Sequence, residues 1–219
     1  MRHTYAGVLV AALLILLSGC ATSRSEILLS LPEAGSGQYS GTGQGVVIGE
    51  VIDRRVFEES PREPSTPSLG SGGVSQATDE VKARAVGRKR NGYGKAMGDV
   101  LLEGGLTVEE VVRSSLTVAL QEAGYVVYHE PVDPGSDALV MDVYIDEFWA
   151  WFNPGFWAIT LNTKIATDLR LNSGGVNELV TIHAKERRQV ATDGAWIEII
   201  EKALQDYRNE VMKKVPKLL

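Results

Sequence analysis

The sequence predicts an α+β domain in which two amphipathic helices pack on one face of a mostly antiparallel sheet of about five or six strands. Two segments whose apolar residues have helical spacing, 106–124 and 195–213, supply the helices. Several segments with alternating or continuous apolar residues supply the strands. Because each helix has one apolar stripe and each strand one apolar face, all of these apolar surfaces can be buried together by laying both helices on one side of the sheet.

The first predicted helix carries its own start and stop signals. Thr107, followed three residues later by Glu110, forms a capping box, and Gly124 supplies the C-terminal stop. The second helix begins after Asp193 or Thr192, and both residue types are suited to cap an N-terminus.

Six segments are expected to contain strands. The first, 46–52, is a largely continuous apolar run bounded by turn residues, and a second strand is expected within 78–90. Four more follow the first helix, and in one of them Leu139, Met141 and Val143 alternate with polar residues. These four are the segments 125–129, 138–149, 157–171 and 179–190.

The first twenty residues have the form of a secretory signal. Arg2 precedes an unbroken apolar run at 6–17, and Ser18 and Gly19 then lead to Cys20. A helix over this run would span only about 18 Å, so a permanent crossing of the roughly 30 Å hydrocarbon layer is disfavoured. We therefore expect residues 1–19 to be removed as a signal peptide.

The tetrapeptide Leu17-Ser18-Gly19-Cys20 resembles the bacterial lipobox. The resemblance implies that Cys20 becomes the mature N-terminus and carries three acyl chains, palmitate among them, as a membrane anchor. The alternative is an ordinary signal peptide with a cysteine near the cut by chance, which would leave an unpaired thiol in an oxidising compartment. Ala21 stands where an aspartate commonly retains such proteins at the inner membrane. The resemblance therefore also implies a lipid-anchored protein of the outer membrane that faces the periplasm of a Gram-negative cell.

The mature chain is expected to consist of a lipidated N-terminus with a flexible tether at 20–45 and a single periplasmic domain at 46–215. Gly and Ser dominate 34–45, and Pro, Ser and Gly dominate 58–75. Segments of such composition bury little apolar area and stay mobile. We expect the first to be the tether and the second to be a long loop of the domain.

Several short motifs together resemble the YajG-type outer-membrane lipoproteins over about residues 20–211. They are the lipobox, Val51-Ile52-Asp53-Arg54, the segment from Val86 to Gly94, and Ala123-Gly124-Tyr125 at the end of the first helix. The architecture is also similar to that of the auxiliary lipoproteins of ABC-type envelope transport systems and of lipopolysaccharide-assembly lipoproteins. The resemblance implies a non-catalytic binding or assembly module of the cell envelope whose partner is a protein or an envelope lipid. The segment 58–75 is longer than the family pattern.

The sequence offers no recognisable catalytic chemistry, and we expect no enzyme, no cofactor and no metal. His129 and His183, the histidines of the mature chain, have no second ligand at a recognisable spacing. Cys20 is the single cysteine, which excludes an intrachain disulfide. The formal charge of −6 argues against nucleic acid as a partner. Two other classes stay open: a structural lipoprotein without a ligand, and an enzyme without a recognisable motif.

Two clusters of residues are predicted contact surfaces. The first is basic and suits lipid phosphates or an acidic partner, although a solvated strand face also explains it. It comprises Lys82, Arg84, Arg88, Lys89, Arg90 and Lys95. The second is aromatic and surrounds Asn153-Pro154-Gly155 at the tip of a predicted hairpin. It comprises Phe148, Trp149, Trp151, Phe152, Phe156 and Trp157.

The aromatic cluster allows two arrangements. Phe148 and Phe152 have one parity along the strand, whereas Trp149 and Trp151 have the other, so a regular hairpin projects rings from both faces. Because only one face lies against the helices, some of the rings should then remain exposed and form the main contact surface. In the other arrangement, a bulge or an irregular turn folds all six rings into one small core.

Overall fold

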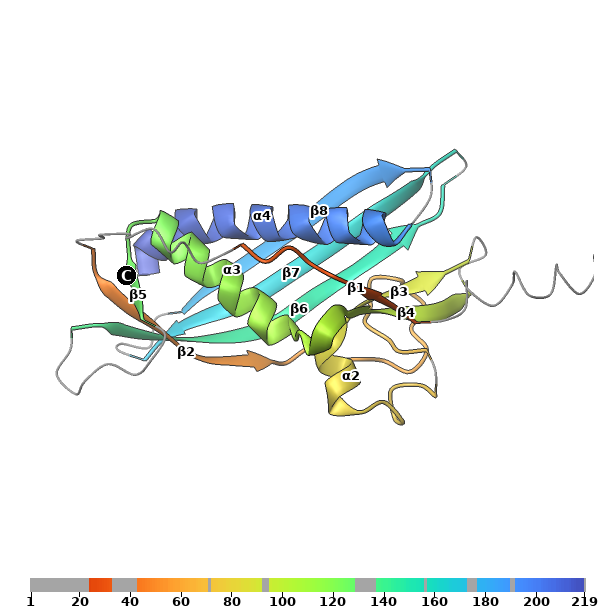
Figure 1. Cartoon of the computed structure of the whole chain (residues 1–219), viewed down its shortest axis with the longest axis horizontal. Helices are drawn as coiled ribbons and strands as arrows, with labels where there is room; N and C mark the ends of the chain where they lie inside the picture. Colours follow the sequence, from red (N-terminus) through yellow and green to blue (C-terminus); the bar gives the residue numbers. More distant parts are fainter. Residues whose placement is uncertain are drawn as a thin grey trace, which may run out of the picture.

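One mixed β-sheet, with two long helices on one of its faces, forms the body of the protein (Figure 1). The structure, a computed structural model, describes residues 24–32, 43–70, 72–91, 95–128, 137–155, 157–172, 177–189 and 192–218. The predicted α+β class is confirmed. The sheet has eight strands in the described part of the chain, which is more than the expected five or six, and it combines parallel and antiparallel pairs.

Helices separate groups of strands between residues 79 and 122, and a long helix follows the last strand. The strands are β1 (Ser25–Ile27), β2 (Gly45–Asp53), β3 (Ala85–Arg90), β4 (Ala96–Leu102), β5 (Val126–Tyr128), β6 (Leu139–Asn153), β7 (Ile159–Leu171) and β8 (Asn177–Arg188). The helices are α2 (Asp79–Arg84), the 3-10 turn η1 (Glu103–Gly105), α3 (Val108–Glu122) and α4 (Asp193–Leu218).

Strand β6 connects all parts of the sheet. Along one edge it pairs antiparallel with β7, which pairs antiparallel with β8. Its other edge is shared: the stretch from Leu139 to Ile145 pairs parallel with β2, and Ala150 pairs parallel with Gly87 of β3. Strand β5 lies beyond β2, whereas β4 and then β1 lie beyond β3. On this side of β6 the sheet therefore divides into two branches.

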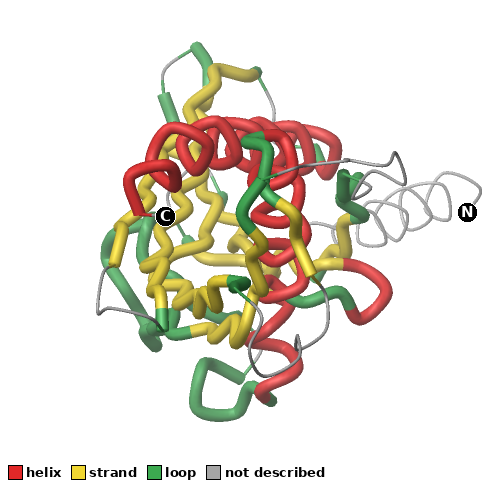
Figure 2. Tube along the Cα trace, turned by 90° about the vertical axis from the view of Figure 1, so that its left-hand side faces the viewer, coloured by secondary structure: helices red, strands yellow, loops and turns green. Residues whose placement is uncertain are grey.

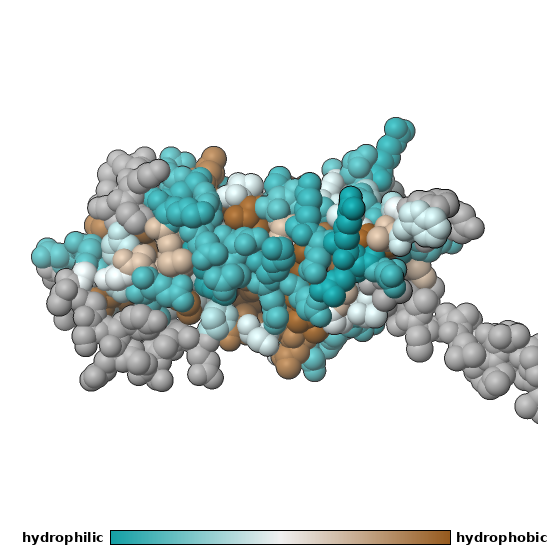
Figure 3. Space-filling view, turned by 90° about the horizontal axis from the view of Figure 1, so that it is seen from above, coloured by the Kyte–Doolittle hydropathy of each residue, from teal (hydrophilic) through white to brown (hydrophobic). Residues whose placement is uncertain are grey.

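The main hydrophobic core lies between the sheet and the helices α3 and α4, which lie together over one face (Figures 1 and 2). Thr107 and Glu110 form the predicted capping box at the start of α3. Tyr207 of α4 is fully buried and its hydroxyl lies 3.0 Å from Oγ1 of Thr167 in β7. Burial raises the pKa of Tyr207 to about 12, so this hydroxyl stays neutral at physiological pH. Seen from above, the outer surface of this side is largely hydrophilic (Figure 3).

A second, smaller core covers part of the opposite face of the sheet. It contains Leu69, Ala85, Leu101, Trp149 and Trp151, with Phe57, Val74, Ala77 and Val81 packed against it. The segment 58–75 contributes to it and has no helix or strand in its described part, as expected of a loop. However, this loop is not merely solvated, because Leu69 is 1% exposed. Apolar residues spaced irregularly among the prolines and serines are enough to hold it on the sheet.

The buried side chain of Arg55 joins the end of β2 to three other segments. Its guanidinium pairs with Asp53, with an Nη2–Oδ2 distance of 2.7 Å. Nη1 also donates to the carbonyl oxygens of Ala85 at 2.6 Å and Phe148 at 3.1 Å, and Nη2 donates to the carbonyl oxygen of Lys82 at 2.9 Å. One side chain therefore binds α2, β3 and β6 to the strand that precedes it.

The N-terminal part of the mature chain differs from the expected flexible tether. Ser25–Ile27 pairs parallel with β4, and Ile27 and Leu29 are 1% and 3% exposed. The prediction of a tether over 20–45 is therefore wrong for residues 24–32, because two apolar side chains there complete the core. Residues 1–23, including Cys20 and the predicted signal peptide, and residues 33–42 lie outside the described residues. Among the described helices, none is long and apolar enough to cross a membrane.

The segment 78–90 was expected to contain one strand, but it also contains a helix. Thr78 accepts a hydrogen bond from the backbone N–H of Val81, which starts α2, and the strand β3 begins only at Ala85. Strand β4 was not predicted. Gly98 and Asp99 interrupt its apolar pattern, and its pairing partners lie in β1 and β3.

Removing the guanidinium of Arg55 should strongly destabilise the fold. Arg55→Met preserves most of the side-chain volume but leaves Asp53 and three carbonyl oxygens without their donor. We expect a loss of about 3 to 5 kcal/mol in the free energy of unfolding, measured by urea denaturation. The same change at the exposed Arg187 is the control, with an expected effect within about 0.5 kcal/mol. Equal midpoints for the two variants would contradict the role of Arg55.

Candidate functional site

The six predicted basic residues do not form one free surface. The guanidinium of Arg84 donates to the carbonyl oxygen of Leu102 at 2.8 and 2.9 Å and pairs with Glu26 at 2.5 Å. Arg88 donates to Oγ of Ser68 at 3.1 Å. These two arginines therefore hold parts of the fold together, and their place in a contact surface stays a prediction.

The other four basic residues differ in what surrounds them. Lys82 lies 3.6 Å from Asp79 on α2, and Lys89 lies 3.5 Å from Asp193 at the start of α4. The pKa of Arg90 is lowered by burial and by the charge of Arg88. Lys95, at the turn before β4, is exposed.

A buried carboxylate that the sequence did not point to interacts electrostatically with Arg88. Asp99 is fully buried in β4, where it accepts hydrogen bonds from Nε of Arg24 at 3.1 Å and from the backbone N–H of Gly70 at 2.7 Å. Burial lowers the pKa of Arg88, while the charge of Asp99 raises it. Asp99 thus ties the start of β1 and the loop to the sheet. In the sequence, it is an isolated acidic residue next to an apolar run.

The aromatic cluster is divided between the two faces of β6. Phe148 and Phe152 are buried in the main core, where the ring of Phe152 lies 6.2 Å from that of Trp196. Trp149 and Trp151 point to the other face but are only 2% and 7% exposed, because the loop at 58–75 and its neighbours cover them. These four residues therefore do not form a contact surface, and the rings do not gather in one small core.

Trp157 is the one member of the cluster that the structure describes as exposed. Its side chain is 87% exposed, the highest fraction among the large apolar residues of the described chain. It follows Pro154 and Gly155 at the turn between β6 and β7. Phe156 lies outside the described residues.

A cavity of about 330 Å³ lies between the loop and the outer face of the sheet. Its walls are formed by Val56, Ser65, Thr66, Pro67, Asp146, Glu147, Trp149 and Lys164. The charges in it are paired, because Nζ of Lys164 lies 2.7 Å from Glu147 and Nη2 of Arg54 lies 2.8 Å from Asp146. Asp146, Glu147 and Lys164 at the wall of the cavity are therefore each engaged with an opposite charge.

A network of charges beside this cavity surrounds one tyrosine. The guanidinium groups of Arg54 and Arg170 each lie 4.5 Å from the centre of the Tyr144 ring. Arg170 also donates to Asp168 at 2.5 and 2.7 Å, and Asn177 donates to the same carboxylate at 3.2 Å. Burial alone would raise the pKa of Asp168, but these hydrogen bonds and the two positive charges together lower it.

The described histidine is engaged with its neighbours. Nε2 of His183 lies 3.2 Å from Oδ1 of Asn162, and its ring lies 5.2 Å from the ring of Trp151. Burial and the charges of Lys185 and Lys164 lower the pKa of His183. In the described ranges, no three His, Cys, Asp or Glu side chains are grouped to hold a metal ion. His129 lies outside those ranges.

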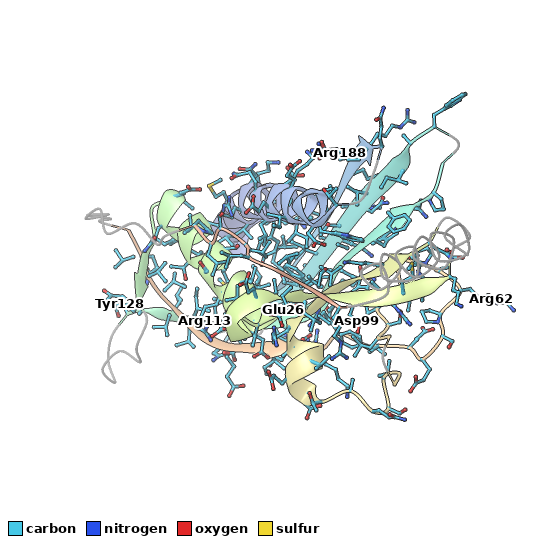
Figure 4. All side chains as sticks on the ribbon, turned by 45° about the vertical axis from the view of Figure 1, so that its right-hand side comes forward. Glu26, Arg62, Asp99, Arg113, Tyr128 and Arg188 are labelled. Atoms are coloured by element: carbon cyan, nitrogen blue, oxygen red, sulfur yellow. The ribbon has the colours of Figure 1, made fainter. Side chains whose placement is uncertain are left out.

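Exposed basic residues and Trp157 gather at one end of the molecule. Strands β3 and β6 are parallel, so both run toward the same end, where each turns into an antiparallel neighbour. Strand β8 also ends there, because Arg188 pairs with Ile159 at the start of β7. We call this the hairpin end and define it by Lys89, Arg90, Lys95, Asn153–Gly155, Trp157, Arg187 and Arg188. Figure 4 shows Arg188 toward this end and Tyr128 at the opposite end.

Comparison with known proteins does not assign the chain to a family. No protein-family model matches it, and no curated protein matches its sequence. A solved structure of an uncharacterized protein is 13% identical, with 87% of this chain and 94% of the other covered and a TM-score of 0.42. The protein XCC0632 from Xanthomonas campestris, described as DUF330, is 10% identical, with 86% and 92% covered and a TM-score of 0.48.

One of the matching structures is a lipoprotein by name. Lipoprotein GNA1162 from Neisseria meningitidis is 9% identical, with 76% of this chain and 99% of the other covered and a TM-score of 0.32. Similarities at these identities and TM-scores carry no argument about function. Membership of the YajG-type family therefore remains a prediction from the sequence motifs.

Two tryptophans near the same turn should respond very differently to truncation. Trp149→Ser removes a buried ring and should cost about 3 to 5 kcal/mol in the free energy of unfolding. Trp157→Ser removes an exposed ring and should change it by no more than about 0.5 kcal/mol. Urea denaturation of both variants measures the difference. A strongly destabilised Trp157→Ser variant would show that this ring also belongs to a core.

The stability contributed by Asp168 should depend on pH. Because the folded protein lowers its pKa below the ordinary value of 3.8, the contribution is present above that value and is lost as the pH falls through the folded pKa. At pH 7, Asp168→Asn should be about 1 to 2 kcal/mol less stable than the wild type. This difference should shrink toward pH 3 in urea denaturation. Asp206→Asn, at a half-exposed ion pair on α4, is the control, and a difference that grows in acid would contradict the assignment.

Proposed function

We propose that the protein is a lipid-anchored, periplasm-facing component of the bacterial cell envelope whose domain is a non-catalytic binding or assembly module. The observation that carries this proposal is the tetrapeptide Leu17-Ser18-Gly19-Cys20 at the end of a short apolar run. Cys20 is its anchor residue. A small residue, Ala21, follows the cysteine, which favours the outer membrane as the destination.

The fold supports an anchor close to the domain. Only Ala21, Thr22 and Ser23 separate Cys20 from Arg24, and Arg24 is already held by the buried Asp99. Several acyl chains on one residue bind a bilayer durably, whereas a single chain binds it only weakly. A protein acylated at Cys20 therefore keeps its folded domain at the membrane surface.

The charged groups of the sheet support a non-catalytic role. Lys164, Arg54 and Arg170 are each engaged with carboxylates, and Asp168 accepts hydrogen bonds from two side chains. A general acid or base needs a pKa near the working pH, but these contacts lower the pKa of Asp168 further below it. We assign these groups to the maintenance of the fold and propose that the protein acts through contacts with an envelope protein or lipid.

The anchor can be tested directly in a Gram-negative host. Cys20→Ser should abolish incorporation of labelled palmitate and leave the signal peptide uncleaved by the lipoprotein pathway. Mass spectrometry of the N-terminal peptide measures both effects. The wild-type peptide should begin at Cys20 and carry the mass of three acyl chains. An unacylated mature N-terminus in the wild type would overturn the proposal.

A substitution at Ala21 tests the membrane destination independently of acylation at Cys20. Ala21→Asp should preserve acylation but move the protein from the outer to the inner membrane fraction. An unchanged distribution between the two membranes, with acylation intact, would contradict the proposed sorting while leaving the anchor in place. Thr22→Ser is the matched control and should change neither acylation nor distribution.

A further inference from the structure

The start of the described chain lies on the side of the hairpin end. Strand β1 is parallel to β4, and Ser25 pairs with Val100, which lies four residues after the start of β4 at Ala96. Because β4 begins at the turn that follows β3, β1 starts toward the hairpin end and runs away from it (Figure 1). Four residues of a strand measure about 13 Å, so the hairpin end extends about that far beyond Ser25.

The connection to the proposed anchor is too short to let the domain move away. Cys20 precedes Arg24 by four positions, and four extended residues reach at most about 14 Å. Arg24 directly precedes β1, and its Nε lies 3.1 Å from Oδ2 of the fully buried Asp99. The membrane surface therefore lies within about 14 Å of Arg24. This distance is similar to the roughly 13 Å by which the hairpin end extends beyond Ser25.

Trp157 places an aromatic ring at this end. It is 87% exposed at the turn between β6 and β7, beyond the region that the loop covers. Tryptophan is enriched where a bilayer meets water, since its ring is apolar and its N–H can bond to headgroups or water. Contact with a membrane surface within its reach is therefore energetically favourable for this exposed ring.

The charge of this end is opposite to that of the whole chain. The protein has a formal charge of −6, but basic side chains outnumber acidic ones at the hairpin end. The basic residues there are Lys89, Arg90, Lys95, Arg187 and Arg188, and the acidic ones beside them are Glu186, Asp193 and Glu198. Lys95 and Arg187 are exposed. Exposed basic residues near a bilayer are attracted to anionic phospholipids.

We infer that the hairpin end docks on the bilayer that holds the acyl chains of Cys20, with Trp157 among the headgroups and Lys95 and Arg187 against anionic phosphates. The inference rests on the proposed lipid anchor and adds an orientation to it. The two hairpin turns face the membrane, whereas the C-terminal part of α4 and the start of β8, joined by Lys214 and Glu178, point away from it.

The mature protein, purified from a Gram-negative host and placed in vesicles, provides the test. It is reconstituted into phosphatidylethanolamine vesicles with and without phosphatidylglycerol, and association is first measured by flotation. Tryptophan fluorescence is then quenched by lipids that carry a nitroxide near the headgroup. Trp157→Phe isolates the signal of this residue, because Trp149, Trp151 and Trp196 are buried. We expect quenching of the wild type to exceed that of Trp157→Phe, and to be stronger with the anionic lipid.

A pair of charge reversals tests the electrostatic part. Lys95→Glu should lower the docking equilibrium about tenfold and reduce the quenching of Trp157. Lys213→Glu makes the same change at an exposed residue near the far end and should have no effect. Raising the salt concentration should mimic Lys95→Glu, because screening weakens exposed charges.

The outcomes separate this inference from the function on which it rests. A protein that fails to float with vesicles would overturn the lipid anchor and the docking together. A protein that floats, but whose wild type and Trp157→Phe variant are quenched alike, would overturn the docking and leave the anchor intact. Equal effects of Lys95→Glu and Lys213→Glu would overturn the role of anionic lipid at the hairpin end.

Discussion

The guanidinium of Arg55 is the interaction on which the arrangement of the layers depends. Burial of a guanidinium is tolerated only where its N–H groups find acceptors. Those acceptors are the carboxylate of Asp53 and backbone carbonyls of α2, β3 and β6. The backbone N–H of Asp53 in turn donates to Oε1 of Glu109 at 2.9 Å, which adds α3 to the same junction. Both branches of the sheet and the helix layer are therefore positioned around one charge.

The same junction directs the loop over the second face of the sheet. The guanidinium of Arg55 lies 5.3 Å from the ring of Phe57, and Phe57 meets Trp149 edge-on with the ring centres 6.0 Å apart. Nε1 of Trp149 then donates to the carbonyl oxygen of Pro64 at 3.2 Å. A segment rich in proline and serine is thus held by aromatic contacts and by hydrogen bonds, among them those that Ser68 and Gly70 make with Arg88 and Asp99. Its cover turns residues that would otherwise form an exposed patch into a second core, and Trp157 is the member of the aromatic cluster that lies beyond it among the described residues.

The fold also places one particular end of the domain near the proposed anchor. Because β1 completes the sheet and Ile27 and Leu29 complete the core, the described domain begins within about five residues of Cys20, the proposed anchor. In the proposed anchoring, the short connection and the ion pair between the exposed Arg24 and the buried Asp99 limit which face of the domain can meet the bilayer. In this arrangement, the orientation of the protein at a membrane is a property of strand pairing rather than of a flexible linker.

The sequence by itself determined the features whose physical cause is local. The capping box of α3, the alternation of β6 and the apolar stripe of α4 are read from neighbouring residues, and so is the lipobox that predicts acylation of Cys20. Tertiary structure decided the rest. Strand β1 pairs with β4, about seventy-five residues away, and the helix α2 interrupts a segment that was expected to contain only a strand. Trp149 and Trp157 are indistinguishable by pattern, yet a loop about eighty-five residues away from Trp149 buries only that one. Burial depends on what else packs against a side chain, and that partner is fixed only when distant segments meet.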